Sequence, residues 1–170
     1  MFFTSLFSHT FCAIHMAGML AVSFYGWVPD APRETLDTAY LATFAVLPLS
    51  WMVCRDECFL SVLWKHMAMA QGDVNNDDHD DITVALLGTG LSQEGVVTAL
   101  YMVQAARVVS VWNVHQRSGL VPRWVLLPTL VLYLVYVDDI GAKRRGRWWQ
   151  PWLRLALGAG LMRILWEVAG

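Results

Sequence analysis

The chain has 170 residues, of which 56% are hydrophobic and only 15% are charged, and its net charge is −2 at pH 7. Soluble domains carry about 25% charged and about 45–50% apolar residues, and a chain of this length has too small an interior to bury the excess. The composition therefore excludes a soluble domain and a disordered tail, and the lack of basic charge excludes a nucleic-acid-binding protein. We expect a single all-α membrane domain over residues 1–170, a polytopic transmembrane helix bundle with four spans and a candidate fifth.

The first predicted span covers residues 2–28 and ends at a turn that begins with Pro29. It contains no Lys or Arg, so it lacks the basic region of a secretory signal, and we expect it to be a retained helix. Ala13, Ala17 and Ala21 recur every four residues. Small residues at this spacing predict a face on which another helix packs closely. His15 is a candidate ligand for haem or a pigment, although a hydrogen-bonded residue inside the bundle is the favoured interpretation.

The second predicted span, residues 39–54, is short, contains Pro48, and has Asp37 or Thr38 as a candidate N-cap. A charged stretch at 55–57 follows, and then another apolar segment at 58–66. Either the helix leaves the membrane at Arg55 and 58–66 lies in the headgroup layer, or one helix carries the charges through the membrane. Unpaired charges at the bilayer centre are costly, so we favour the first alternative. The three cysteines, at positions 12, 54 and 58, are interpreted as buried structural thiols.

Residues 71–81 form the strongly polar segment of the chain and are interpreted as a solvated acidic loop. Asp78 replaces the glycine that a calcium-binding EF-hand requires, which excludes a standard EF-hand. Asp77, Asp78 and Asp81 resemble the DDxxD motif of membrane prenyltransferases, which implies Mg²⁺ held against a diphosphate. Those enzymes have more helices than this chain can form. Adventitious or structural binding of Mg²⁺ or Ca²⁺ here therefore stays an alternative to the solvated loop.

The third predicted span covers residues 95–112. The preceding apolar segment, 82–91, is either the start of the same helix or a short segment folded back at the surface. Gln93 and Gln104 share one helical face, with Arg107 about 40° away. A polar stripe on an apolar helix predicts an interface, either inside the chain or with another subunit.

The fourth predicted span covers residues 121–137, after a loop at 113–123, and Asp138 and Asp139 are expected to end it. The fifth candidate covers residues 151–168 and carries Arg154 and Arg163 on opposite faces, which suggests a short span with both side chains reaching toward opposite surfaces. Between these two spans lies a cluster of basic and aromatic residues that predicts an anchor for lipid headgroups. Its members are Lys143, Arg144, Arg145, Arg147, Trp148 and Trp149.

Basic residues favour the side of the membrane that retains positive charge. With the N-terminus on that side, it receives Arg55, Lys65 and the cluster at 143–147, against Arg33, Arg117 and Arg123 on the other side. This distribution predicts an N-terminus on the positive-inside face.

The sequence contains no complete catalytic motif. We therefore expect a non-catalytic accessory subunit of a larger integral membrane complex. Its partners would be other integral membrane subunits and lipids, not nucleic acid, and its expected ligand is structural phospholipid rather than a cofactor. Its expected home is an organellar energy-transducing membrane, with the mitochondrial inner membrane and its respiratory chain favoured over the thylakoid.

Two alternatives stay open. One is a small oligomeric channel or transporter lined by the third span. The other is a Mg²⁺-dependent enzyme that acts on phosphorylated lipids through Asp77, Asp78 and Asp81.

Overall fold

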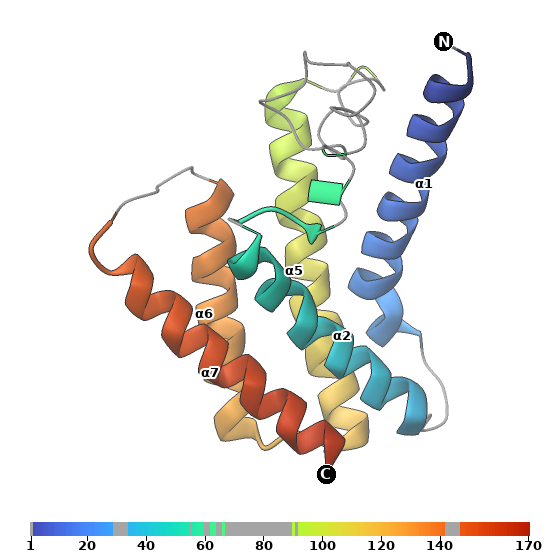
Figure 1. Cartoon of the computed structure of the whole chain (residues 1–170). Helices are drawn as coiled ribbons and strands as arrows, with labels where there is room; N and C mark the ends of the chain where they lie inside the picture. Colours follow the sequence, from blue (N-terminus) through green and yellow to red (C-terminus); the bar gives the residue numbers. More distant parts are fainter. Residues whose placement is uncertain are drawn as a thin grey trace.

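The computed structural model describes residues 2–28, 34–54, 56–59, 62, 63, 66, 90, 92–141 and 147–170; the side chains of residues 2–9, 11, 12 and 93 are outside this description. The described elements are all helical, which confirms the all-α prediction (Figure 1). In chain order they are α1 (Phe2–Phe24), the short 3₁₀ helix η1 (Tyr25–Trp27), α2 (Glu34–Val53), α5 (Gln93–Ser118), α6 (Arg123–Gly141) and α7 (Gln150–Ala169).

Among the described residues, three helices are long and apolar enough to cross a membrane: Glu34–Val53, Glu94–Ser118 and Arg123–Gly141. These helices are compatible with membrane insertion by length and composition. The predicted total of four spans and a candidate fifth is not confirmed. In α7, the charged residues Arg154, Arg163 and Glu167 interrupt the apolar sequence.

Helix α2 begins five residues earlier than the sequence predicts and ends at Val53. Asp37 and Thr38 therefore lie inside its first turns and cannot be its N-cap. The Asp37 side chain binds Arg117 of α5 instead. Asp56 has a positive backbone angle, φ 71°, which an α-helix cannot contain. This turn rules out one helix that continues through the charged residues. Of the predicted interfacial segment 58–66, part lies outside the described residues.

Helix α5 begins at Gln93, where the Ser92 side chain accepts a hydrogen bond from the Gly95 amide at 3.2 Å. Gly90 has φ +86° and Ser92 has an extended backbone, so the helix does not extend back through these two residues. The rest of segment 82–91 lies outside the described residues. The helix continues to Ser118 and ends at Gly119, whose φ is +64°. The predicted loop at 113–123 is therefore wrong over its first half.

Helices α6 and α7 agree with their predicted ranges except at the end of α6, which extends through Asp138 and Asp139 to Gly141. Helix α7 packs against both α2 and α6, and α1 packs mainly along α5. In Figure 1, α1 stands at the edge of the bundle, beside α5. The core between α2, α6 and α7 is apolar and aromatic, and includes Leu41, Phe44, Tyr133, Leu157 and Leu161.

Helix α7 carries a glycine, Gly160, where it packs against Thr129 of α6. A Cβ atom on Gly160 would overlap the side chain of Thr129, whereas one on Gly158 would meet nothing within 4 Å. Gly160 therefore lets the two helices pack at short range.

Candidate functional site: polar contacts between the helices

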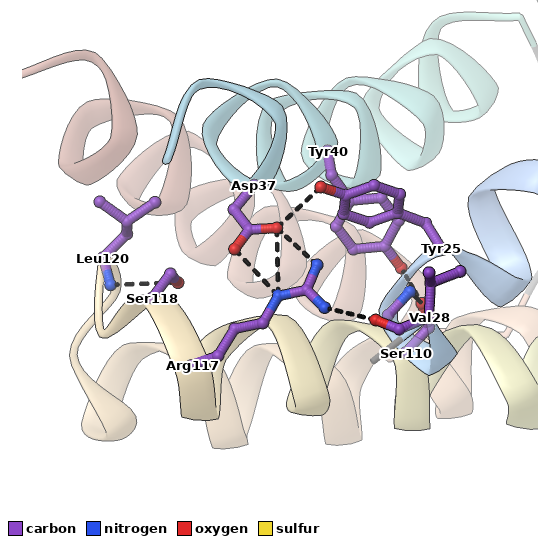
Figure 2. Close-up of polar contacts among 9 residues, drawn as sticks. Tyr25, Val28, Asp37, Tyr40, Ser110, Arg117, Ser118 and Leu120 are labelled. Atoms are coloured by element: carbon purple, nitrogen blue, oxygen red, sulfur yellow. Dashed lines mark hydrogen bonds and ion pairs between the residues drawn. The ribbon is translucent and has the colours of Figure 1, made fainter. Parts of the chain in front are cut away.

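The first turns of α2 are bound to the end of α5 by a salt bridge. The Arg117 Nη2 and Asp37 Oδ1 atoms lie 2.6 Å apart, and Arg117 Nε donates to Asp37 Oδ2 at 3.0 Å (Figure 2). The Asp37 side chain is only 1% exposed and that of Arg117 is 23% exposed. Arg117 also donates to the Val28 carbonyl at 3.1 Å, so one guanidinium joins α5, α2 and the chain after η1. A bidentate pair of this kind fixes orientation as well as distance.

Two tyrosines extend this contact into the bundle. The Tyr25 hydroxyl donates to Asp37 Oδ1 at 2.9 Å, and its ring stacks on Tyr40 with centroids 4.8 Å apart. The Tyr40 hydroxyl donates to the Ser110 hydroxyl at 2.8 Å. The two tyrosines therefore connect the salt bridge at the end of α5 to Ser110 on the same helix.

Ser110 also brings η1 close to α5. Its hydroxyl oxygen accepts a hydrogen bond from the Gly26 amide at 2.6 Å. A Cβ atom on Gly26 would overlap the backbone carbonyl of Ser110, so this approach requires glycine. The turn after α1 is thus fixed against the middle of α5.

A second salt bridge holds the other end of α2. The Asp56 carboxylate accepts hydrogen bonds from Arg154 Nη2 at 2.8 Å and 2.6 Å, and from the Tyr136 hydroxyl at 2.8 Å. The Asp56 side chain is 6% exposed and that of Arg154 is 33% exposed. Arg154 was expected to reach toward a membrane surface, but it binds a carboxylate within the bundle instead. Asp56 thereby links the turn after α2 to α6 and α7.

The polar stripe of α5 faces α6. Arg107 Nη1 donates to the Tyr133 hydroxyl at 3.2 Å, and that hydroxyl donates to Gln104 Oε1. Arg107 is 2% exposed. The Gln93 side chain lies outside the described residues. Of the two alternatives for this stripe, the structure places Gln104 and Arg107 at a contact inside the chain.

The residues proposed for α1 have different surroundings. His15 is buried, and its Nε2 atom lies 3.3 Å from Cys58 Sγ, which brings α1 against the turn after α2. Ala13, Ala17 and Ala21 are exposed. The small-residue face therefore does not form the contact of α1 with α5. The buried face of α1 contains His15, which contacts Cys58, and Ser23, whose hydroxyl donates to the Met19 carbonyl at 2.8 Å within the helix.

The remaining candidates lie largely outside the described residues. Asp77, Asp78 and Asp81 are outside them, as are Lys143, Arg144 and Arg145. Of the predicted headgroup anchor, Arg147 lies 5.9 Å from the centre of the Trp149 ring, and Trp148 is exposed. Over the described part of the chain, no group of three or more His, Cys, Asp or Glu side chains is arranged to hold a metal ion.

These contacts can hold helices together, because each joins side chains from different elements of one chain. Sequence reasoning found Gln104 and Arg107 but missed Asp37, Asp56 and Ser110 as contact residues. Asp37 and Asp56 lie at the two ends of one apolar run, and Arg117 and Arg154 lie near the ends of two others. Opposite charges at such ends were a signal that these helices could pair, although not a signal of which charges would meet.

Comparison of the chain with protein families, with curated proteins and with solved structures found no match in any of the three.

Proposed function

We propose that this protein is a non-catalytic accessory subunit of a larger integral membrane complex. The observation that supports this most is the division of the helix surfaces. Buried polar groups such as Asp37, Asp56 and Arg107 bind other helices of the same chain, whereas the outward faces of α2, α5 and α6 present large apolar side chains. A surface of this kind suits lipid tails and the helices of other membrane proteins.

The exposed alanine face of α1 is the proposed contact with a partner helix. Ala13, Ala17 and Ala21 are exposed, and α1 packs on the bundle through its opposite side. In a membrane, small residues let the backbone of a second helix approach closely. We also propose the mitochondrial inner membrane as the location and the respiratory chain as the host complex.

The channel alternative receives less support from the geometry. A lumen lined by α5 would need Gln104 and Arg107 to face water, whereas both bind Tyr133 inside the bundle. The Mg²⁺-dependent enzyme alternative rests on residues outside the described part of the chain. Neither is therefore the function that the geometry favours.

The test is native-gel electrophoresis of the mildly solubilised source membrane, followed by mass spectrometry of the band that contains this chain. The proposal expects migration with other integral membrane proteins at a fixed ratio of copies. Migration of the chain alone, or as a small homo-oligomer, would contradict it.

A pair of matched variants tests the proposed contact face. Ala17→Trp places a large side chain on the exposed face of α1, and Ala159→Trp makes the same change on an exposed position of α7. We expect A17W to release the chain from the complex and A159W to leave it bound. Equal retention of both variants would exclude this face of α1 as the interface.

A further inference from the structure

A cavity of about 310 Å³ lies at the turn between α5 and α6. It is lined by His115, Gln116, Gly119, Val121, Pro122 and Arg123. We infer that this cavity binds the phosphate of a membrane phospholipid. The inference goes beyond the proposed function: it depends on α6 lying in a membrane, and not on the chain being a subunit of a complex.

The cavity carries the donors that a phosphate needs. Arg123 is exposed, and it forms no salt bridge with a carboxylate in the described part of the chain. It is also the first residue of α6, where the first hydrogen bonds within the turn are donated by Val125 and Leu126 to the Pro122 carbonyl at 3.0 Å. The amides that precede these bonds, at the positive end of the helix dipole, favour an anion. Arg123 adds a full positive charge in the same place.

A buried histidine, His115, lines the same cavity. His115 is 5% exposed, and its Nδ1 atom is buried without a hydrogen-bond partner among the described residues. Buried polar atoms are nearly always hydrogen-bonded. The neutral imidazole accepts a hydrogen bond at one ring nitrogen, so a hydroxyl group of a lipid headgroup can donate to Nδ1. This contact would satisfy the atom.

The outward face of α6 favours a lipid over free phosphate. Trp124, Leu127, Val131 and Val135 are exposed, and their spacing of three or four residues places them in one row along the helix. This row begins at the cavity, beside Arg123. A phospholipid with its phosphate at Arg123 can lay an acyl chain along the row, with Trp124 at the level of the headgroups.

The experiment is native mass spectrometry of the full-length chain in mild detergent, titrated with dioleoylphosphatidylglycerol. Arg123→Gln removes the proposed phosphate ligand. Arg163→Gln is the matched control, because it makes the same charge change on a residue that pairs with Glu167. Arg163 belongs to α7, whose C-terminal end lies at the same end of the bundle as the start of α6 (Figure 1). A charge-assisted hydrogen bond corresponds to roughly a tenfold or greater change in affinity. We expect R123Q to weaken lipid binding by about this factor and R163Q to leave it unchanged.

Further ligands and one conservative variant complete the test. Dioleoylglycerol, which lacks the phosphate, should bind weakly to the wild-type protein, and inorganic phosphate alone should not bind measurably. R123K, which keeps the charge, should retain part of the affinity, and this result separates loss of the contact from loss of folding. Equal lipid affinity of R123Q and wild type would overturn the site. Binding of inorganic phosphate as tight as that of the lipid would overturn the choice of a lipid, and equally tight binding of dioleoylglycerol would overturn the role of the phosphate.

Discussion

Removal of Arg154 should destabilise the bundle more than removal of Arg163, the other arginine on α7. The Asp56 carboxylate is 6% exposed and accepts hydrogen bonds from both Arg154 and Tyr136. The change Arg154→Met keeps the apolar stem of the side chain and leaves this carboxylate with Tyr136 alone. A buried charge without its partner is costly, so the free energy of unfolding should fall.

The magnitude follows from the exposure of the two partners. Breaking a fully buried pair costs about 3–5 kcal/mol, and an exposed pair is worth about 0.2–1 kcal/mol. Arg154 is 33% exposed, so water screens part of the interaction, and we expect a loss of about 2 kcal/mol for R154M. The exposed pair Arg163–Glu167 lies within one helix, and R163M should cost about 0.3–0.5 kcal/mol.

A double-mutant cycle isolates the interaction itself. The second single variant of the cycle is Asp56→Asn, because Asn tolerates the positive φ of this residue and its side-chain oxygen still accepts a hydrogen bond from Tyr136. D56N leaves a partly exposed arginine that can reach water, so it should cost only about 1 kcal/mol. Once Asn is at position 56, R154M should add little, which gives a coupling energy of about 1–2 kcal/mol.

The assay is reversible unfolding in mixed micelles with increasing dodecyl sulfate, followed by tryptophan fluorescence and circular dichroism. R163M is the matched control for the loss of one positive charge on α7. A loss for R154M no larger than that for R163M would refute the reasoning, and so would a cycle whose two changes are additive.

The remaining predictions concern close approaches and the buried polar contact. Gly26→Ala should destabilise the protein by more than 1 kcal/mol, because the new methyl group meets backbone that cannot move aside. Gly18→Ala, in open space within α1, should be neutral or stabilising by up to about 1 kcal/mol. Thermal unfolding in detergent compares the two variants. Gly160→Ala should lower the melting temperature by separating α6 from α7, and Gly158→Ala, where nothing lies within 4 Å, should not. Tyr133→Phe removes the hydroxyl that joins α5 to α6 and should cost about 1–3 kcal/mol in the same dodecyl sulfate titration; an unchanged unfolding curve would show that this contact contributes nothing.

Much of the fold was predictable because long apolar runs determine where membrane helices form. The predicted centres of α2, α5, α6 and α7 agree with the structure, while the start of α2 and the ends of α5 and α6 differ by four to six residues. Helix α5 continues through Asn113 and His115, and α6 continues through Asp139, although these residues are polar. The first polar residue after an apolar run was therefore a poor predictor of where α5 and α6 end. A helix can extend beyond its apolar part as long as its backbone hydrogen bonds continue.

The contacts between helices were predictable only in part. The polar stripe of α5 identified Gln104 and Arg107, since a polar residue on an apolar helix needs a partner. The partners themselves are distant in the chain: Asp37 and Arg117 are 80 residues apart, and Asp56 and Arg154 are 98 apart. Periodicity within one segment carries no information on such pairs. For the same reason the alanine spacing on α1 suggested a packed face without showing whether the bundle would cover it.

Insertion of α2, α5 and α6 into a lipid bilayer underlies both proposals, and cysteine accessibility measures this insertion directly. In a variant without native cysteines, single cysteines replace Val46 and Val131, which are exposed in the middle of α2 and α6, and Gln116, which is exposed near the end of α5. In opened membranes, a water-soluble maleimide should label Q116C but not V46C or V131C, and unfolding in dodecyl sulfate should make all three reactive. If V46C and V131C react in the same opened membranes, before dodecyl sulfate is added, as fast as Q116C, this result would contradict membrane insertion and the functional proposal that rests on it.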